Sequence, residues 1–201
     1  MGVDKVILKA FLSTLAAIAA MFVILLGVLL MCFPATMMDL TYSLGMESWS
    51  ITQAKRAYGR GEDIHYIAKA METAIEIEDF KQIEVCGLKM IADEDFIVYC
   101  AEKDENSDSS FGEYDDYIYG EIGVAKYNRG KKTEAIEFVF ANTQETAFPK
   151  NNAIVAVLLT SLRDGDMQTA NLIKGKMEER LGKLSQADRA YCEELLGLIS
   201  K

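Results

Sequence analysis

Hydrophobic and polar positions are distributed very unevenly along this chain of 201 residues. No charged side chain occurs between Ala10 and Met38, and residues 10–33 are almost entirely apolar. As a helix, this apolar stretch would reach about 36 Å, which is more than the hydrocarbon thickness of a bilayer. The pattern therefore predicts a transmembrane helix over residues 10–33, after a short N-terminus of residues 1–9.

A cleaved secretory signal peptide is the alternative interpretation of this stretch, because Lys5 and Lys9 give it a charged start. The apolar region of a signal peptide is usually shorter, and it ends in a small-x-small cleavage site. Here the end reads LLMCFPA, which places Phe33 where a small residue is needed. We therefore expect an anchor that stays in the mature protein.

The basic residues beside the span predict its orientation. Lys5 and Lys9 precede it, and the next basic residue is Lys55. Basic residues near a span tend to stay in the cytoplasm. We expect a protein of the cell membrane that crosses it once, with residues 1–9 cytoplasmic, a linker over 34–46 and an extracytoplasmic remainder.

Apolar residues at three- and four-residue spacing, typical of amphipathic helices, dominate the chain beyond the linker. The segments with this spacing are 51–58, 64–75, 80–91, 117–127, 134–140, 153–162, 169–177 and 189–199. Turn sequences separate them, and prolines occur only at positions 34 and 149. The predicted fold class is all-α.

The predicted turns recur at a nearly constant interval. Gly61, Gly130 and Gly165 mark three of them, and a turn near Asp95 would divide the larger gap into two intervals of 34 and 35 residues. Such a period indicates stacked helical hairpins, because one hairpin cannot bury its apolar face alone.

Residues 116–149 resemble a tetratricopeptide repeat (TPR), a family of helix-turn-helix units. With Gly130 at the turn, Gly123 takes the small position of the first helix and Tyr127 the late aromatic position, while Ala135 and Ile136 form the small-apolar pair of the second helix. Small residues there let two helix backbones approach closely. The resemblance implies a TPR-like α-solenoid.

The neighbouring units match this pattern less well. The following unit keeps Gly165 and Ala170 but has Leu158 at the first small position, and the unit near Asp95 is barely recognisable. We expect about four helical hairpins over residues 47–200 and a closing helix that Ser185 caps. An unrelated helical bundle is the alternative.

Composition excludes several functions. Residues 39–201 carry 30 acidic and 19 basic side chains, a charge that disfavours nucleic-acid binding. His65 is the single histidine, and no phosphate-binding loop, nucleophile elbow or zinc-protease motif is present. The cysteines at 32, 86, 100 and 192 have no metal-site spacing. We therefore expect neither an enzyme nor a cofactor.

An acidic loop near residues 104–112 allows one metal-site hypothesis. Oxygen-bearing side chains occupy positions 1, 3, 5, 7 and 12 of an EF-hand-like loop, namely Asp104, Asn106, Asp108, Ser110 and Asp115. The sixth position is Ser109 where such loops have glycine. A solvated linker is the simpler interpretation, and a calcium-responsive sensor is the alternative function.

The TPR resemblance implies a concave groove lined by the first helix of each hairpin. Its predicted lining is Tyr117, Val124, Tyr127, Asn128, Asn152, Val155, Leu159 and Arg163. Tyrosine rings beside amide and guanidinium groups suit an extended peptide or a helix of a protein partner. The apolar members have a second interpretation, which is packing between repeats.

Small residues recur near one face of the anchor, at Ala16, Ala20 and Gly27. Such faces permit close helix contacts in lipid, so oligomerisation through the anchor is possible. Together these patterns predict a non-enzymatic, single-pass adaptor or scaffold that binds a protein or peptide partner near the membrane.

Overall fold

The computed structural model describes residues 3–61, 63–106, 113–149 and 152–199 of the chain. Over these residues it contains α-helices, one short 3₁₀ helix and no strand, so the predicted all-α class is confirmed. The chain divides into two compact units, residues 1–62 and 63–201. This division falls after the third helix, whereas the sequence places a domain boundary at residues 46 and 47.

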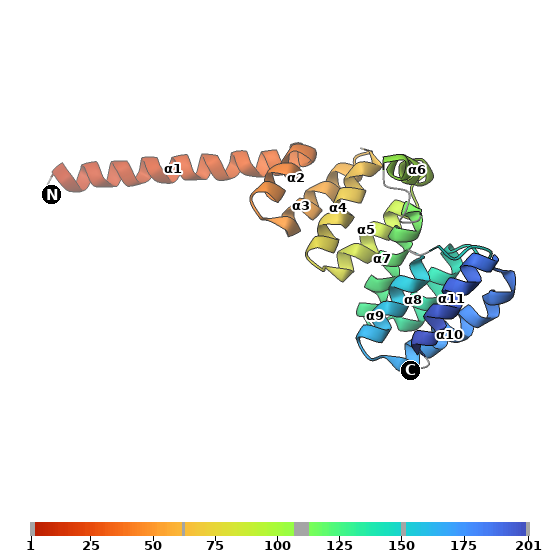
Figure 1. The fold of residues 1–201 in the computed structure, drawn as a ribbon. Coiled ribbons are helices and arrows are strands. Elements are labelled where there is room, and N and C mark those ends of the chain that lie inside the picture. Colours follow the sequence, from red (N-terminus) through yellow and green to blue (C-terminus); the bar gives the residue numbers. More distant parts are fainter. Residues whose placement is uncertain (1–2, 62, 107–112, 150–151, 200–201) are drawn as a thin grey trace. The chain divides into compact units, whose positions relative to one another are not determined.

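The first unit consists of α1 (Val3–Cys32), α2 (Pro34–Ser43) and α3 (Glu47–Tyr58) (Figure 1). The part of α1 from Ile7 to Cys32 has a mean hydropathy of 2.9 and is unburied. Among the described residues, one helix, at the N-terminus, is long and apolar enough to cross a membrane.

The segment predicted as a linker contains the helix α2. Pro34 stands at its start, where the missing proline N–H costs nothing. Met37 and Met38 are buried, and the Ser50 hydroxyl of α3 donates a hydrogen bond to the Met38 carbonyl at 3.1 Å. These contacts between α2 and α3 place α2 in the first unit.

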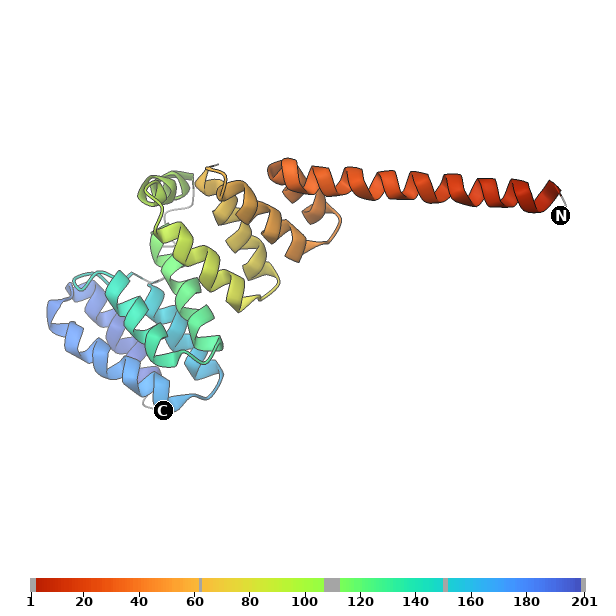
Figure 2. The same cartoon turned by 180° about the vertical axis from the view of Figure 1, so that it is seen from behind.

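The second unit contains eight α-helices among its described residues. They are α4 (Ile64–Glu76), α5 (Phe80–Ile91), α6 (Phe96–Asn106), α7 (Tyr114–Asn128), α8 (Lys132–Asn142), α9 (Ala153–Arg163), α10 (Met167–Arg180) and α11 (Gln186–Ile199), with the 3₁₀ helix η1 (Leu181–Lys183) after α10. Each packs on near neighbours in the chain: α4 on α5, α5 and α6 on α7, α7 on α8 and α9, α9 on α10, and α10 on α11 (Figure 2). The order of packing therefore follows the order of the sequence.

Glycine at the predicted turns has the backbone conformation that such turns require. Gly130, between α7 and α8, has φ +79°, and Gly165, between α9 and α10, has φ +70°. Gly61 in the first unit has φ +80°. Residues with a Cβ rarely adopt these angles, so the glycines explain where the helices end.

The core of the C-terminal helices comes from the apolar faces predicted for α7 to α11. Its buried members include Tyr127, Ala135, Ile136, Val139, Ile154, Val157, Leu158, Ile173, Met177, Cys192 and Leu196. The predicted cap of α11 is also present: the Asp188 N–H donates to Ser185 Oγ at 3.2 Å, and that hydroxyl donates to Asp188 at 2.8 Å. This reciprocal pair fixes the start of the closing helix.

Candidate partner-binding groove

The helices α7 and α9 lie side by side because small residues face each other along their contact. A Cβ at Gly120 would be 3.3 Å from Ala156 Cβ and 3.5 Å from Ala153 Cα. Backbones this close leave little room for larger side chains between them. The residues on the outer edges of the contact consequently form the walls of a shallow depression.

A hollow of about 320 Å³ opens over this contact. Its lining is Asp116, Tyr117, Gly120 and Glu121 from α7, Asn152 before α9, and Val155, Ala156 and Leu159 from α9. Tyr117 and Leu159 are 42% and 48% exposed, while Val155 is buried. The hollow thus has a floor that is mostly apolar, with Asp116 and Asn152 as its buried polar members, and two large exposed side chains at its rim.

A second hollow of about 480 Å³ adjoins the first and shares Glu121 with it. Its lining is Ile75, Glu78, Phe80, Ile83, Glu121, Val124, Asn128 and Arg163. The Asn128 amide donates to the Val124 carbonyl at 2.9 Å, and Arg163 Nε lies 3.1 Å from Asp164 Oδ1. We refer to the two hollows together as the α7–α9 groove.

The structure brings seven of the eight predicted groove residues to these hollows. Tyr117, Asn152, Val155 and Leu159 line the first, and Val124, Asn128 and Arg163 line the second.

Tyr127 is the eighth, and the structure places it in the core. It is 4% exposed, and its hydroxyl donates to Asp166 Oδ2 at 3.2 Å. Tyr127 is four residues after Gly123, so it shares the stripe of α7 that packs on its neighbours. Tyr127 is therefore a packing residue of the helical core and does not line the hollows.

Two carboxylates of the groove, Asp116 and Glu121, are costly to ionise. Burial raises the pKa of Asp116 to about 7, with a further contribution from the charges of Asp115 and Glu113, while a hydrogen bond from the Ala153 backbone acts in the opposite direction. Burial also raises the pKa of Glu121. A positively charged group placed against these side chains would stabilise their ionised forms.

An acidic hollow of about 550 Å³ adjoins the groove and shares Asp116 and Asn152 with it. Its carboxylates are Asp104, Glu113, Asp115, Asp116 and Asp188. Asn152 is 1% exposed; its Oδ1 accepts the Ile154 N–H at 2.9 Å, and its Nδ2 has no hydrogen-bond partner. The sequence signal for this hollow was only the general acidity of residues 104–116.

The predicted calcium ligands lie partly outside the described residues, which exclude Asp108, Ser110 and the side chain of Asn106. Asp104 belongs to α6, and its Oδ1 accepts the Tyr114 N–H at 2.8 Å. Asp115 Oδ1 accepts the Asp116 N–H at 2.7 Å. Within the described ranges, no three acidic, histidine or cysteine side chains are arranged to hold a metal ion. The calcium loop stays a prediction.

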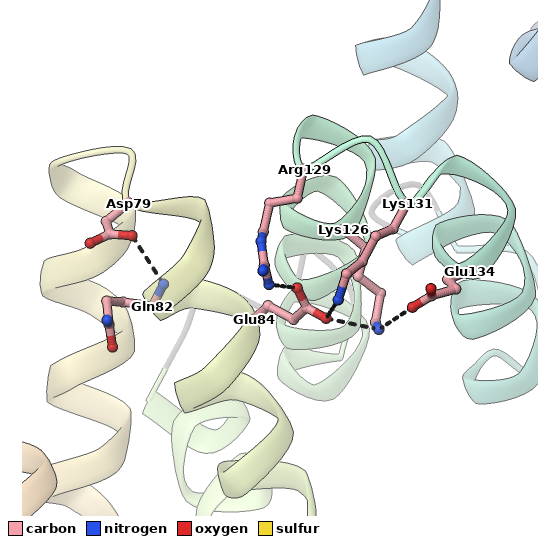
Figure 3. Close-up of polar contacts among 7 residues, drawn as sticks. All are labelled: Asp79, Gln82, Glu84, Lys126, Arg129, Lys131 and Glu134. Carbon is pink, nitrogen blue, oxygen red and sulfur yellow. Dashed lines mark hydrogen bonds and ion pairs between the residues drawn. The ribbon is translucent and has the colours of Figure 1, made fainter.

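The sequence pattern does not predict the buried ion cluster around Glu84. Glu84 of α5 lies 3.1 Å from Lys126 Nζ and 2.8 Å from Lys131 Nζ, and it also pairs with Arg129 (Figure 3). Burial favours the protonated form, but the hydrogen bonds from Lys131 and Lys126 and the charges of Lys126 and Arg129 outweigh it and keep the pKa of Glu84 below its ordinary value. The cluster joins α5 to the α7–α8 hairpin. Its sequence signal was one glutamate on the apolar face of α5.

No family model, no curated protein and no solved structure matches this chain.

Proposed function

We propose that this protein is a non-enzymatic adaptor anchored in the membrane by α1, and that its α7–α9 groove holds an extended segment of a partner protein. Residues 1–9 lie in the cytoplasm and the second unit lies on the extracytoplasmic side. The second unit acts as a TPR-like α-solenoid.

Packing between consecutive helices supports the solenoid. The hairpins α7–α8 and α9–α10 turn at Gly130 and Gly165, which are 35 residues apart. The first helices of these hairpins, α7 and α9, pack on each other. Stacked hairpins with a period of this size bury a continuous core and present one face formed by their first helices.

The composition of the groove is the main observation that supports the proposed binding function. Tyr117 and Leu159 are large, exposed and adjacent to a hollow with a mostly apolar floor, and Glu121 lies where the two hollows meet. An apolar side chain fits between Tyr117 and Leu159, and a basic side chain suits Glu121. The favoured partner segment therefore carries an apolar and a basic residue close together.

Site-specific photo-crosslinking in native membranes tests this function. A photoreactive phenylalanine analogue replaces Leu159 in the groove or, as the matched control, Leu172, which is an exposed leucine of α10. We expect a crosslinked partner at position 159 and none at position 172.

The segment identified in that partner is then synthesised, and its affinity for the purified full chain is measured. Glu121→Gln is expected to weaken the binding by about tenfold, because it removes the charge that faces the basic residue of the segment. Equal crosslinking at both positions, or an affinity that Glu121→Gln leaves unchanged, contradicts the proposed groove.

A further inference from the structure

A hollow of about 290 Å³ lies in the first unit, between the end of α1 and the helix α3. Its lining is Gly27, Leu30 and Met31 from α1 and Trp49, Thr52, Gln53 and Arg56 from α3. One wall thus belongs to the candidate membrane-spanning helix, and the other belongs to α3, which follows α2 in the chain.

Arg60 fastens the chain after α3 to the end of α1. Its guanidinium donates to the Cys32 carbonyl at 3.1 Å and also to the Met31 carbonyl. The last carbonyls of a helix have no partner within the helix and carry partial negative charge, so a guanidinium stabilises them. This contact keeps both walls of the hollow in place.

The length of the span places this hollow at the membrane surface. About 20 residues of helix are needed to cross the hydrocarbon core. Counted from Ala10, directly after the last charged residue on the N-terminal side, this length ends at Leu29. Gly27, Leu30 and Met31 are therefore at the boundary between acyl chains and headgroups.

The segment that follows the span exposes several large apolar side chains, and one of them, Trp49, lines the hollow. Phe33, Leu40, Leu44, Met46 and Trp49 are large exposed hydrophobic residues that follow directly after the span. Large apolar patches mark sites of protein or membrane contact, and tryptophan is enriched at membrane interfaces. Because this segment follows the span directly in the chain and Trp49 shares the hollow with α1, lipid is the favoured material against these side chains.

Two polar groups in the hollow have the chemistry of a phospholipid headgroup site. Arg56 is exposed, and a guanidinium can hold a phosphate with two parallel hydrogen bonds. Gln53 is 2% exposed, and its Oε1 has no hydrogen-bond donor. A buried acceptor without a donor is costly, and a headgroup hydroxyl would satisfy it.

We propose that this hollow binds an anionic phospholipid of the phosphatidylglycerol type, with the phosphate on Arg56, a headgroup hydroxyl near Gln53, and an acyl chain along Gly27 and Leu30. Lys55 and Arg60 add positive charge to the same end of α3. The inference rests on the proposed membrane anchoring, since without it no lipid reaches α1.

Trp49 is the single tryptophan of the chain, so its fluorescence reports on this hollow. The full-length protein is placed in phosphatidylcholine nanodiscs that contain a small fraction of brominated lipid, which quenches nearby tryptophans. The brominated lipid is phosphatidylglycerol in one sample and phosphatidylcholine in the other. We expect phosphatidylglycerol to be enriched about fivefold near Trp49, the effect of one basic side chain at an anionic surface.

Two variants test the assignment in different ways. Arg56→Glu reverses the charge and is expected to abolish the preference for phosphatidylglycerol. Gly27→Phe fills the hollow without touching any charge, since a Cβ at Gly27 has no heavy atom within 4 Å, and it is expected to reduce quenching by both lipids. The control Lys89→Glu makes the same charge change on α5 in the second unit and is expected to behave like the wild type.

A second reporter separates failure of the lipid site from failure of the anchor. In a Trp49→Phe background, Phe22→Trp places the only tryptophan in the middle of the exposed surface of α1. If this reporter is quenched but Trp49 shows no lipid preference, or if the preference survives in Arg56→Glu, the lipid site is wrong and the anchor stands. If this reporter is not quenched, the anchor and the lipid site both fail.

Discussion

Gly123 of α7 lies directly against Val139 of α8. A Cβ at Gly123 would be 2.4 Å from Val139 Cγ1 and 2.8 Å from Val157 Cγ2. Non-bonded carbon atoms do not come this close, so a Cβ at position 123 would displace Val139 and Val157. The size of the side chain at position 123 therefore limits how near α7 comes to both α8 and α9. The small residue that the TPR pattern places here therefore has a steric role in the structure.

Gly123→Ala is expected to lower the free energy of unfolding by about 1–3 kcal/mol, the usual cost of inserting a methyl group into a packed core. Thermal unfolding of the full chain in detergent, followed by circular dichroism, measures the loss. Gly175→Ala is the matched control, because Gly175 is also helical but has open space around its Cβ position. There alanine is expected to be neutral or stabilising.

Glu84→Gln is expected to destabilise the second unit by about 3 kcal/mol, because Lys126 and its neighbours would keep their charges without a buried counter-charge. Urea unfolding of the full chain at neutral pH measures this change. Glu134→Gln removes an exposed partner of the same Lys126 and serves as the control, for which we expect less than about 1 kcal/mol.

The Glu84 cluster also has a defined pH dependence. The pKa of Glu84 is lower in the folded state than its ordinary value of 4.5, so its contribution to stability is fully present above that value. The contribution is lost as the pH falls through the folded-state pKa. Stability profiles of wild type and Glu84→Gln should converge below pH 4.5, and parallel profiles would contradict the assignment.

Asp116→Asn is expected to change the pH dependence of stability in the opposite direction from Glu84→Gln. The pKa of Asp116 is about 7 in the folded state, against an ordinary value of 3.8, so between these values the folded state binds more protons than the unfolded state. Stability from this group therefore rises as the pH falls from above 7 toward 4. The variant should lose this rise, which denaturant titrations at several pH values would detect as a flatter profile than that of the wild type.

The thiols are expected to differ in reactivity. Cys86, Cys100 and Cys192 are buried, whereas Cys32 is exposed. Burial is the main cause that raises the pKa of Cys100 to about 12, and it also raises the pKa of Cys192. Since the thiolate is the reactive form, a soluble thiol reagent should modify one cysteine of the folded chain in detergent and four after denaturation. Modification of Cys100 in the folded chain, detected by mass spectrometry, would contradict the burial.

Local patterns predicted most of the helices and their turns, because each depends on neighbouring residues, but α2 and α6 were not among the predicted helical segments. Gly130 and Gly165 stop helices through their own backbone angles, and Ser185 caps α11 through a residue three positions away. Seven predicted groove residues also reach the two hollows, since helical periodicity places them on one side of α7 and α9.

The features that the sequence does not predict depend on contacts between residues that are far apart in the chain. Glu84 meets Lys126 only because α5 packs on α7, and one acidic residue on an apolar face does not name its partners. Asp116 likewise reaches the start of α9 at Ala153. The division after residue 62 has the same origin, since it depends on contacts between helices and not on composition.

Tyr127 distinguishes packing from partner binding most directly. Its hydroxyl donates to Asp166, which also pairs with Lys132 and accepts the Thr169 N–H at the start of α10. Tyr127→Phe removes one hydrogen bond and keeps the ring, so it is expected to cost about 1 kcal/mol of stability. Because the ring is in the core, this variant should crosslink its partner through position 159 as the wild type does. Tyr117→Ala changes the exposed rim of the groove and leaves the core intact. Its stability should stay within about 0.5 kcal/mol of wild type, while its crosslinking through position 159 should be weaker. If Tyr127→Phe abolishes crosslinking while the protein stays folded, Tyr127 contacts the partner and the groove extends further into α7 than the two hollows.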